Sequence, residues 1–324
     1  MSDISKLLPK KPVRLYKQAG VIARYQGTVV ACWVHTMNKY FKNTYGDVWM
    51  FWDKNENALW VFQEEPMHVI AGEFIERSKN GFPAGFAQRW ATLQKSVEAY
   101  SREISSLHLP TLSLDELERH YLEMLKRHGD MWALSIFIDS FDAGDDQREI
   151  ARIVAEHSFT PGEVEILATP HTPSYATAWE QALWCIKQGA LSAHNVAHEY
   201  FWIRTDYHFF DETDAVFVGE AAQGAHEVSW VSTNDKEQKI LAAYGMRKNP
   251  LAVFQTLTQW RDDRKRINYV GFYGLMRILS EVGKRRAHPC GASRRRQRHR
   301  RFSSGVRRAL RSDCGQLARQ QAAR

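Results

Sequence analysis

An abrupt change in composition near Gly283 limits which part of this 324-residue chain can build a hydrophobic core. Residues 284–324 carry Lys284 and thirteen arginines against a single acid, Asp313, and they contain few large apolar side chains. The residues before them hold 30 basic and 36 acidic residues, so the net charge of +7 comes from this tail alone. A segment this poor in apolar side chains cannot offset the entropy of ordering it, which predicts a disordered basic tail over residues 285–324.

Two interpretations of the tail are open. A genuine basic arm would bind RNA, DNA or anionic lipid through its charge. An out-of-frame translation of a GC-rich gene would produce the same surplus of arginine, and it explains why lysine and helical periodicity both stop after Lys284. We favour the frameshift interpretation. Nucleic acid is therefore an expected partner only through the arginine-rich tail, and only if that tail is native.

The composition of the remaining body excludes several classes of protein. No stretch approaches the ~20 apolar residues that cross a bilayer, and the N-terminus lacks the apolar core of a secretory signal. Four widely separated cysteines argue against a disulfide framework or a zinc ribbon: Cys32, Cys185, Cys290 and Cys314. We expect a cytoplasmic protein without membrane partners. Its slightly acidic body also lacks the charge pattern of a nucleic-acid-binding domain.

The N-terminal region shows strand patterns. Residues 48–52 and 58–62 are aromatic and β-branched runs separated by five polar residues, which predicts a hairpin. Residues 27–34 are a weaker candidate for a third strand.

From about residue 68 onward the apolar spacing becomes helical. Ser113 with Glu116 forms a predicted capping box, and Ser174 is a second predicted N-cap. The expected helices span residues 84–107, 114–128, 145–157, 175–188, 191–203, 213–222, 235–244 and 250–284. The predicted fold is α+β and mostly α, with a small N-terminal hairpin or sheet followed by a multi-helix bundle. The expected organisation is a β-containing region at 1–68, a helical domain at 69–284 and the disordered tail at 285–324.

Two histidines present a possible metal site. His194 and His198 stand four residues apart on a predicted helix, but no third ligand is identifiable, and Glu199 follows the pair instead of lying between them. We interpret both histidines as packing residues and expect no metal.

A charged stretch interrupts the apolar stripe of the last predicted helix. Arg264 falls on that stripe, where an unpaired charge would be strongly unfavourable. One interpretation places a phosphate or another acidic ligand against Arg261, Arg264 and Lys265, which share a helix face. The alternative, which we favour, pairs Arg264 with a carboxylate on a neighbouring helix. The adjacent acids Asp262 and Asp263 are interpreted as part of a solvated face.

No self-sufficient catalytic motif is present. The sequence lacks a phosphate-binding GxxxxGK[ST] loop, a GxGxxG after a strand and a GxSxG elbow. We therefore assign no catalytic residue to this chain.

Three stretches in order together resemble one family. Residues 166–174 (ILATPHTPS), 191–207 (LSAHNVAHEYFWIRTDY) and 259–268 (QWRDDRKRIN) resemble segments of phosphoenolpyruvate (PEP) synthase-related, PEP-utilising proteins. In that family such segments belong to the helical region that precedes a mobile phosphohistidine domain. The family-motif residues, which we expect to be structural, are His198, Trp202, Asp206, Tyr207, Asp263 and Asn268.

This resemblance implies a phosphotransferase-related module that is not catalytic alone. Enzymes of the family pass phosphate through a histidine in a TSHAA-like loop and bind ATP in a separate ATP-grasp domain. Neither part is found here, and the arginine-rich tail begins where the mobile domain is expected. ATP and Mg²⁺ are thus expected only if a separately encoded mobile or ATP-grasp domain supplies the missing architecture. The alternative function is a non-enzymatic helical binding module with a basic, anion-binding tail.

Overall fold

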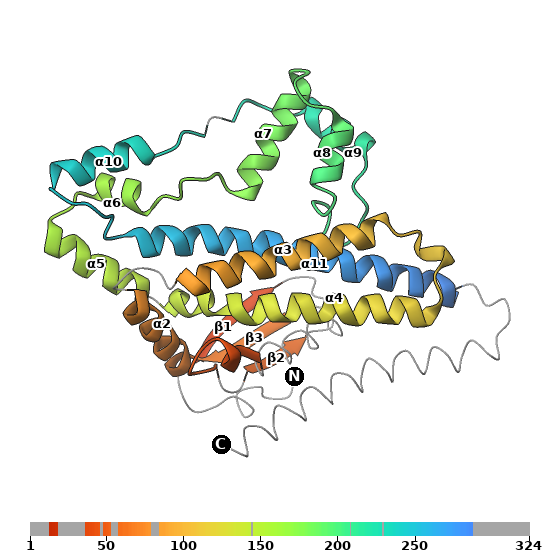
Figure 1. Cartoon of the computed structure of the whole chain (residues 1–324), viewed down its shortest axis with the longest axis horizontal. Coiled ribbons are helices and arrows are strands. Elements are labelled where there is room, and N and C mark those ends of the chain that lie inside the picture. Colours follow the sequence, from red (N-terminus) through yellow and green to blue (C-terminus); the bar gives the residue numbers. More distant parts are fainter. Residues whose placement is uncertain are drawn as a thin grey trace, which may run out of the picture.

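The computed structural model describes residues 13–18, 36–45, 48–52, 58–78, 84–143, 145–207, 209–228 and 230–287. A small sheet lies below a layer of long helices, and a group of shorter helices lies above them (Figure 1). The predicted α+β, mostly α fold is confirmed. In the described part of the chain, no helix is both long and apolar enough to cross a bilayer.

The sheet has three antiparallel strands, β1 (Val13–Gln18), β2 (Val48–Trp52) and β3 (Ala58–Gln63). β3 lies in the middle and pairs with both neighbours in the order β1-β3-β2. The predicted pairing of residues 48–52 with 58–62 is confirmed, while the hairpin loop and the candidate strand at 27–34 lie outside the described residues. The third strand is β1, which we did not predict.

Three long helices form the centre of the molecule: α3 (Ala84–Ser106), α4 (Leu114–Ser135) and α11 (Ala252–Ala287). Each of them packs against the other two. Two glycines let α11 approach its neighbours closely. A Cβ on Gly271 would lie 2.7 Å from the ring of His128 on α4, and a Cβ on Gly274 would lie 3.3 Å from side chains of α3 and α4.

Shorter helices surround this centre. α2 (Glu64–Ser78) follows β3 directly, and a 3-10 segment, η4 (Ile136–Ala143), continues α4. Two further 3-10 turns are η2 (Met37–Lys39) and η3 (Leu109–Thr111). The remaining helices are α5 (Asp145–His157), α6 (Pro161–Ala168), α7 (Tyr175–Lys187), α8 (Ala193–Glu199), α9 (Ala215–Gln223) and α10 (Asn234–Ala243).

The predicted helix starts rest on local hydrogen bonds. Ser113 and Glu116 form the capping box at the start of α4, and the Ser174 side chain caps α7 by accepting from the backbone N–H of Thr177. Thr160 and Glu163 form a second capping box at α6, a helix that we did not predict. Because capping depends on residues three apart in sequence, it is the part of this fold that is most visible in the sequence.

The helices α7, α8 and α9 have a small core of their own. Its buried residues are separate from the main core and comprise Ala182, Leu183, Val196, Ala197, Val218 and Ala222. The group stands above α3 and α11 in Figure 1. The line along which these helices meet the long ones is where the candidate site lies.

The last helix extends beyond its predicted end at residue 284. α11 continues to Ala287, and Arg285 donates to the backbone carbonyls of Leu109 and Leu112 at 2.7 Å each. Arg285 also pairs with Glu281 at 2.6 Å. The first arginines after Gly283 therefore belong to the folded body. Residues 288–324, which make up most of the predicted tail, lie outside the described residues.

Candidate functional site

A loop between α6 and α7 is fastened along one side of α11. Gln255 donates to the carbonyl of Thr169 at 2.8 Å, and the Thr172 hydroxyl donates to the side-chain carbonyl of Gln259. Asp262 accepts the backbone N–H of Tyr175 at 2.8 Å, at the first turn of α7. Positions 255, 259 and 262 recur at helical spacing, so one side of α11 holds the whole loop in place.

A cavity of about 310 Å³ opens where this loop and α7 meet α3 and α11. We call it the central cleft. It is lined by Glu98, Arg102, Thr172, Pro173, Tyr175, Ala178, Glu199, Tyr200, Trp202, Gln259, Asp262, Asp263 and Arg266. Residues of the stretches 166–174, 191–207 and 259–268 all contribute to this lining.

The two arginines of the central cleft share one carboxylate. Glu98 on α3 accepts from Arg102 through Oε1 at 3.1 Å and from Arg266 through Oε2 at 3.3 Å. Arg102 also donates to the carbonyls of His198 and Glu199 at the end of α8. Arg102 is thus engaged by three acceptors of the protein, whereas Arg266 has, within the described residues, the single contact with Glu98.

The two aspartates of the central cleft are held differently. Asp262 accepts the Tyr175 N–H, and Asp263 accepts from the Gln259 amide at 3.1 Å. Within the described residues neither carboxylate has an ion-pair partner inside 4 Å. Burial is the main reason why the pKa of each carboxyl is raised above its usual value. The predicted solvated face is therefore wrong for these residues, because α7 and its loop cover them.

Aromatic rings line the central cleft together with the acids. Trp202, which is only 2% exposed, meets Tyr175 edge to face with ring centroids 5.7 Å apart. Tyr200 lies 6.2 Å from Trp202 in a tilted arrangement. Rings next to desolvated carboxylates create an environment that favours a positively charged group.

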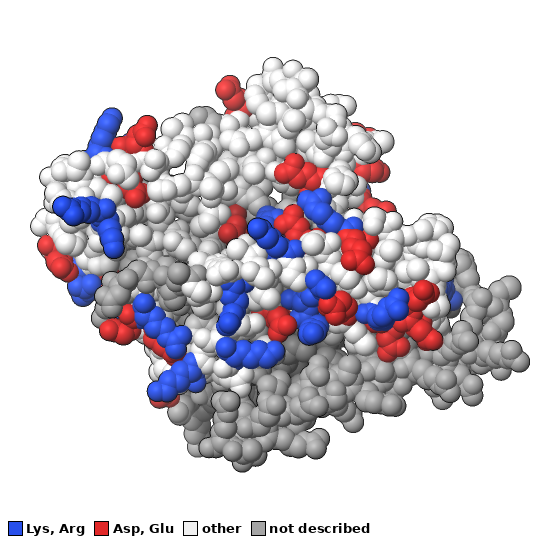
Figure 2. Space-filling view, viewed as in Figure 1, with Lys and Arg blue, Asp and Glu red and all other residues white. Residues whose placement is uncertain are grey.

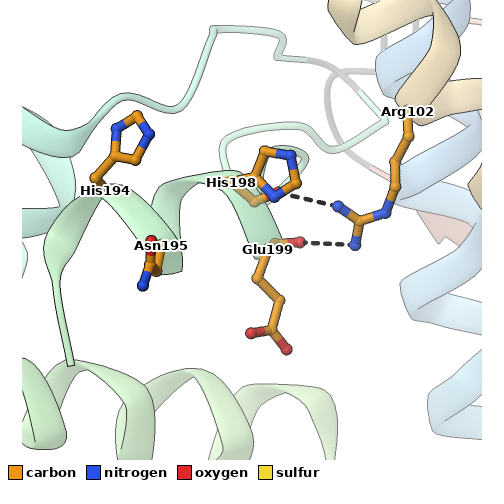
Figure 3. Close-up of a pocket in the computed structure, with 5 residues that line it drawn as sticks. All are labelled: Arg102, His194, Asn195, His198 and Glu199. Atoms are coloured by element: carbon orange, nitrogen blue, oxygen red, sulfur yellow. Dashed lines mark hydrogen bonds between the residues drawn. The ribbon is translucent and has the colours of Figure 1, made fainter. Parts of the chain in front are cut away.

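A shallower hollow of about 430 Å³ adjoins the central cleft across Arg102 and Glu199. Figure 3 shows His194 and His198 on the same side of α8, while the Arg102 guanidinium points at the backbone where that helix ends. Glu199 turns its carboxylate away from both rings (Figure 3). No group of three or more potential ligands in the described residues is arranged to hold a metal ion.

Arg264 lies on the opposite side of α11 from the central cleft. It makes a 2.6 Å ion pair with Asp139 of η4, and the two side chains are 17% and 19% exposed. This is the pairing with a neighbouring segment that we favoured from the sequence. The candidate anion-binding partners Arg261 and Lys265 are exposed on α11. Phosphate binding by this trio stays a prediction, and Arg264 would join it only by releasing Asp139.

A second polar group lies one turn beyond Arg264 on α11, where Asn268 is buried in the core. The Asn268 amide lies 3.4 Å from the Tyr207 hydroxyl, and its carbonyl accepts from His128 Nε2 at 3.2 Å. His128 is fully buried, and burial lowers its pKa to about 4, so its ring is neutral at pH 7. Burial likewise raises the pKa of the Tyr207 hydroxyl. These groups are neutralised or bonded inside the bundle.

The remaining family-motif residues have local roles. Asp206 accepts the backbone N–H of Phe209 at 2.6 Å and closes a tight turn after α8. α8 itself ends at Glu199, so the predicted helix over residues 191–203 is shorter than expected. His198 lies on the surface beside Arg102, and its backbone carbonyl makes the contact there.

The central cleft contains residues that sequence reasoning did not select. Glu98, Arg102 and Tyr175 come from helices outside the charged stretch, and Arg266 was passed over within it. The only sequence signal is the i,i+4 spacing of Glu98 and Arg102, which is common on helix surfaces.

Comparison with known proteins gives no relative: no family model, no curated protein and no solved structure matches this chain.

Proposed function

We propose that this chain is a helical binding module of a PEP-utilising, phosphotransferase-related protein, and that the central cleft is its binding site. One observation carries the proposal. The three stretches that resemble the family are separated by up to about a hundred residues, yet all three line the same cavity. Convergence of distant segments on one cavity is what a binding site requires, and helix packing alone does not demand it.

The proposal assigns no bond-making step to this chain. Phosphate transfer would need a phosphohistidine domain and an ATP-grasp domain, supplied as separate cytoplasmic partners, and ATP with Mg²⁺ would enter only through them. The role of the helical module is to hold a ligand or a partner side chain in the central cleft.

The charge of the central cleft favours a cationic group. Its lining holds four acids and two arginines, and both arginines pair with Glu98, so the net charge of the lining is −2. The rings of Tyr175 and Trp202 lie beside these acids. We infer that an ammonium or guanidinium group, on a small ligand or on a partner's side chain, binds between the acids and the rings.

Benzylamine is a suitable probe because it combines an ammonium group with one ring. We expect saturable binding to the full chain by calorimetry, with affinity reduced by about tenfold or more in a D262N/D263N variant. Asparagine keeps the acceptor oxygens for Tyr175 and Gln259, so the cleft should stay folded. Binding that is equal in the variant, or benzyl alcohol binding as tightly as benzylamine, would contradict the proposal.

Two further probes separate the sources of the cation. A lysine-rich peptide that binds more tightly than benzylamine would favour a partner's side chain, and the reverse would favour a small ligand. A D235N/E227Q variant, which removes two exposed acids elsewhere, is the matched control and should bind benzylamine like the parent chain.

Charge distribution favours a second function for the tail. Thirteen arginines lie in residues 284–324, whereas acidic and basic residues alternate over the face of the body in Figure 2. If the tail is native, we infer that it binds nucleic acid with a steep salt dependence. Truncation after Ala287 leaves α11 complete and should abolish that binding. Salt-independent binding, or binding that survives truncation, would contradict this second function.

A further inference from the structure

A second, larger cavity than the central cleft lies at the other end of the bundle. It measures about 880 Å³ and opens between α5, α10 and the beginning of α11, and none of its lining residues belongs to the stretches 166–174, 191–207 and 259–268. We call it the end cavity. In Figure 1 these elements meet at the left of the molecule, while α7 and α8 lie to the right. The end cavity is therefore a separate feature from the central cleft.

The floor of the end cavity is apolar and closely packed. Ile153 of α5, Leu241 of α10 and Phe254 of α11 line it, and their exposed fractions are 7%, 4% and 6%. Each comes from a different helix of the same core. A preformed apolar floor of this kind suits the organic body of a small ligand.

The carboxylates around the end cavity are already engaged. Arg152 bonds Glu149 through two nitrogens at 2.8 and 2.9 Å, and it bonds Glu156 at 2.8 Å. Glu237 is 5% exposed and accepts from His171 at 2.7 Å and from Gln255 at 3.0 Å. Within the described residues, none of these acids forms an ion pair with Arg247 or Lys248.

Two cations at the rim have no such partner. Arg247 and Lys248 both line the end cavity, and the described residues provide no carboxylate within ion-pair distance of either. The loop that carries them is fixed at both ends. Gly245 adopts a φ of 65° to end α10, and Asn249 donates to the carbonyl of Leu167 at 2.8 Å. The cavity therefore presents two adjacent positive charges on an ordered loop above an apolar floor.

We propose that the end cavity binds a small organic phosphate ester. The phosphate lies against Arg247 and Lys248, which supply several N–H donors, and the organic body rests on Ile153, Leu241 and Phe254. Guanidinium and ammonium groups together suit a dianion better than a monoanion. This inference does not depend on the proposed function of the central cleft.

Phenyl phosphate is the probe, measured by calorimetry on the full chain. We expect it to bind at least about tenfold more tightly than inorganic phosphate, because burying one ring on the apolar floor is worth about that factor. Benzyl alcohol, which lacks the charge, and benzoate, a monoanion, should both bind more weakly than phenyl phosphate.

Two double variants locate the site. R247A/K248A removes exposed side chains and should weaken phenyl phosphate binding about tenfold or more, whereas K236A/K239A removes two exposed lysines of neighbouring α10 and should leave it within about twofold. Circular dichroism should show both variants folded. Equal weakening by both variants, benzyl alcohol binding as well as phenyl phosphate, or no saturable binding up to about 10 mM would each overturn the proposal.

The same variants keep the two sites distinguishable. R247A/K248A should bind benzylamine normally, and D262N/D263N should bind phenyl phosphate normally. Loss of phenyl phosphate binding in D262N/D263N would overturn the assignment to the end cavity. Benzylamine binding would still test separately whether the central cleft is a binding site.

Discussion

Charged side chains on two sides of the same stretch of α11 differ in whether they have an ion-pair partner. On one side Arg264 meets Asp139 at 2.6 Å, and the neighbouring Asn268 joins His128 to Tyr207 inside the core. On the other side Asp262 and Asp263 face a cavity and have only neutral hydrogen-bond donors. We call the first side closed, because its charged side chain has an ion-pair partner within the bundle. The second is open, and burial raises the pKa of both its carboxyls, which an added positive charge would lower.

This difference shows which charges near a helix bundle indicate binding. Removing one partner of a buried ion pair leaves the other charge uncompensated, so the effect appears as a loss of stability. A half-buried charge without an ion pair opposes folding, and proteins retain such groups at functional sites. The contrast predicts that removing a charge lowers the free energy of unfolding on the first side and raises it on the second.

The largest effect is expected at the closed side. Asp139→Ala leaves the Arg264 guanidinium without its counter-ion and should lower the free energy of unfolding by about 3–4 kcal/mol, the lower part of the range for buried pairs. Urea denaturation followed by tryptophan fluorescence measures it. Glu156→Ala, which breaks the exposed Arg152–Glu156 pair, should lower it by less than about 1 kcal/mol. Similar losses in the two variants would remove the distinction between closed and open charges.

The pH dependence of stability tests the buried histidine. Its pKa is about 4 in the folded chain and about 6.5 when unfolded, so the unfolded state binds the proton first as pH falls. The stabilisation is complete above pH 6.5 and should decline by about 3 kcal/mol between pH 6.5 and pH 4. His128→Gln removes this titration and should flatten the profile over that window. Parallel profiles for the two proteins would show that His128 is not buried as a neutral ring.

Gly271 tests how closely α11 approaches α4. A Cβ at this position meets three ring atoms of His128 at 2.7–2.9 Å, and the buried ring has no room to withdraw. Gly271→Ala should therefore lower the free energy of unfolding by about 1–3 kcal/mol, despite the better helix propensity of alanine. Gly72→Ala is the matched control, because it lies inside α2 with no atom within 4 Å, and it should raise stability by up to about 1 kcal/mol. A stabilising Gly271→Ala would contradict the packing of α11 on α4.

The sequence predicted features that depend on near neighbours. Such features include the strands at 48–52 and 58–62 and the helix caps at Ser113 and Ser174. Each depends on residues close together in sequence, and the structure contains all of them. The apolar stripe of α11 also placed Arg264 toward the interior. β1 was missed because its sequence, VRLYKQ, has no strict alternation of apolar and polar residues.

The central cleft could not be predicted from the sequence, because its residues come together only in the tertiary structure. Glu98 and Arg266 are 168 residues apart, and Tyr175 and Asp262 are 87 residues apart. Asp262 and Asp263 look like any charged pair on a helix. Only the covering of α11 by α7 and its loop decides that these acids face a cavity, and that covering is a property of the tertiary structure.

The most direct test of the account is the stability of Asp263→Asn. Asparagine keeps the acceptor for Gln259 and removes a charge that burial disfavours, so the free energy of unfolding at pH 7 should rise slightly, by less than about 1 kcal/mol. Benzylamine affinity, measured on the same protein, should fall. A clear loss of stability, of the kind expected for Asp139→Ala, would show that the central cleft is another closed structural site and would contradict its assignment as a binding site.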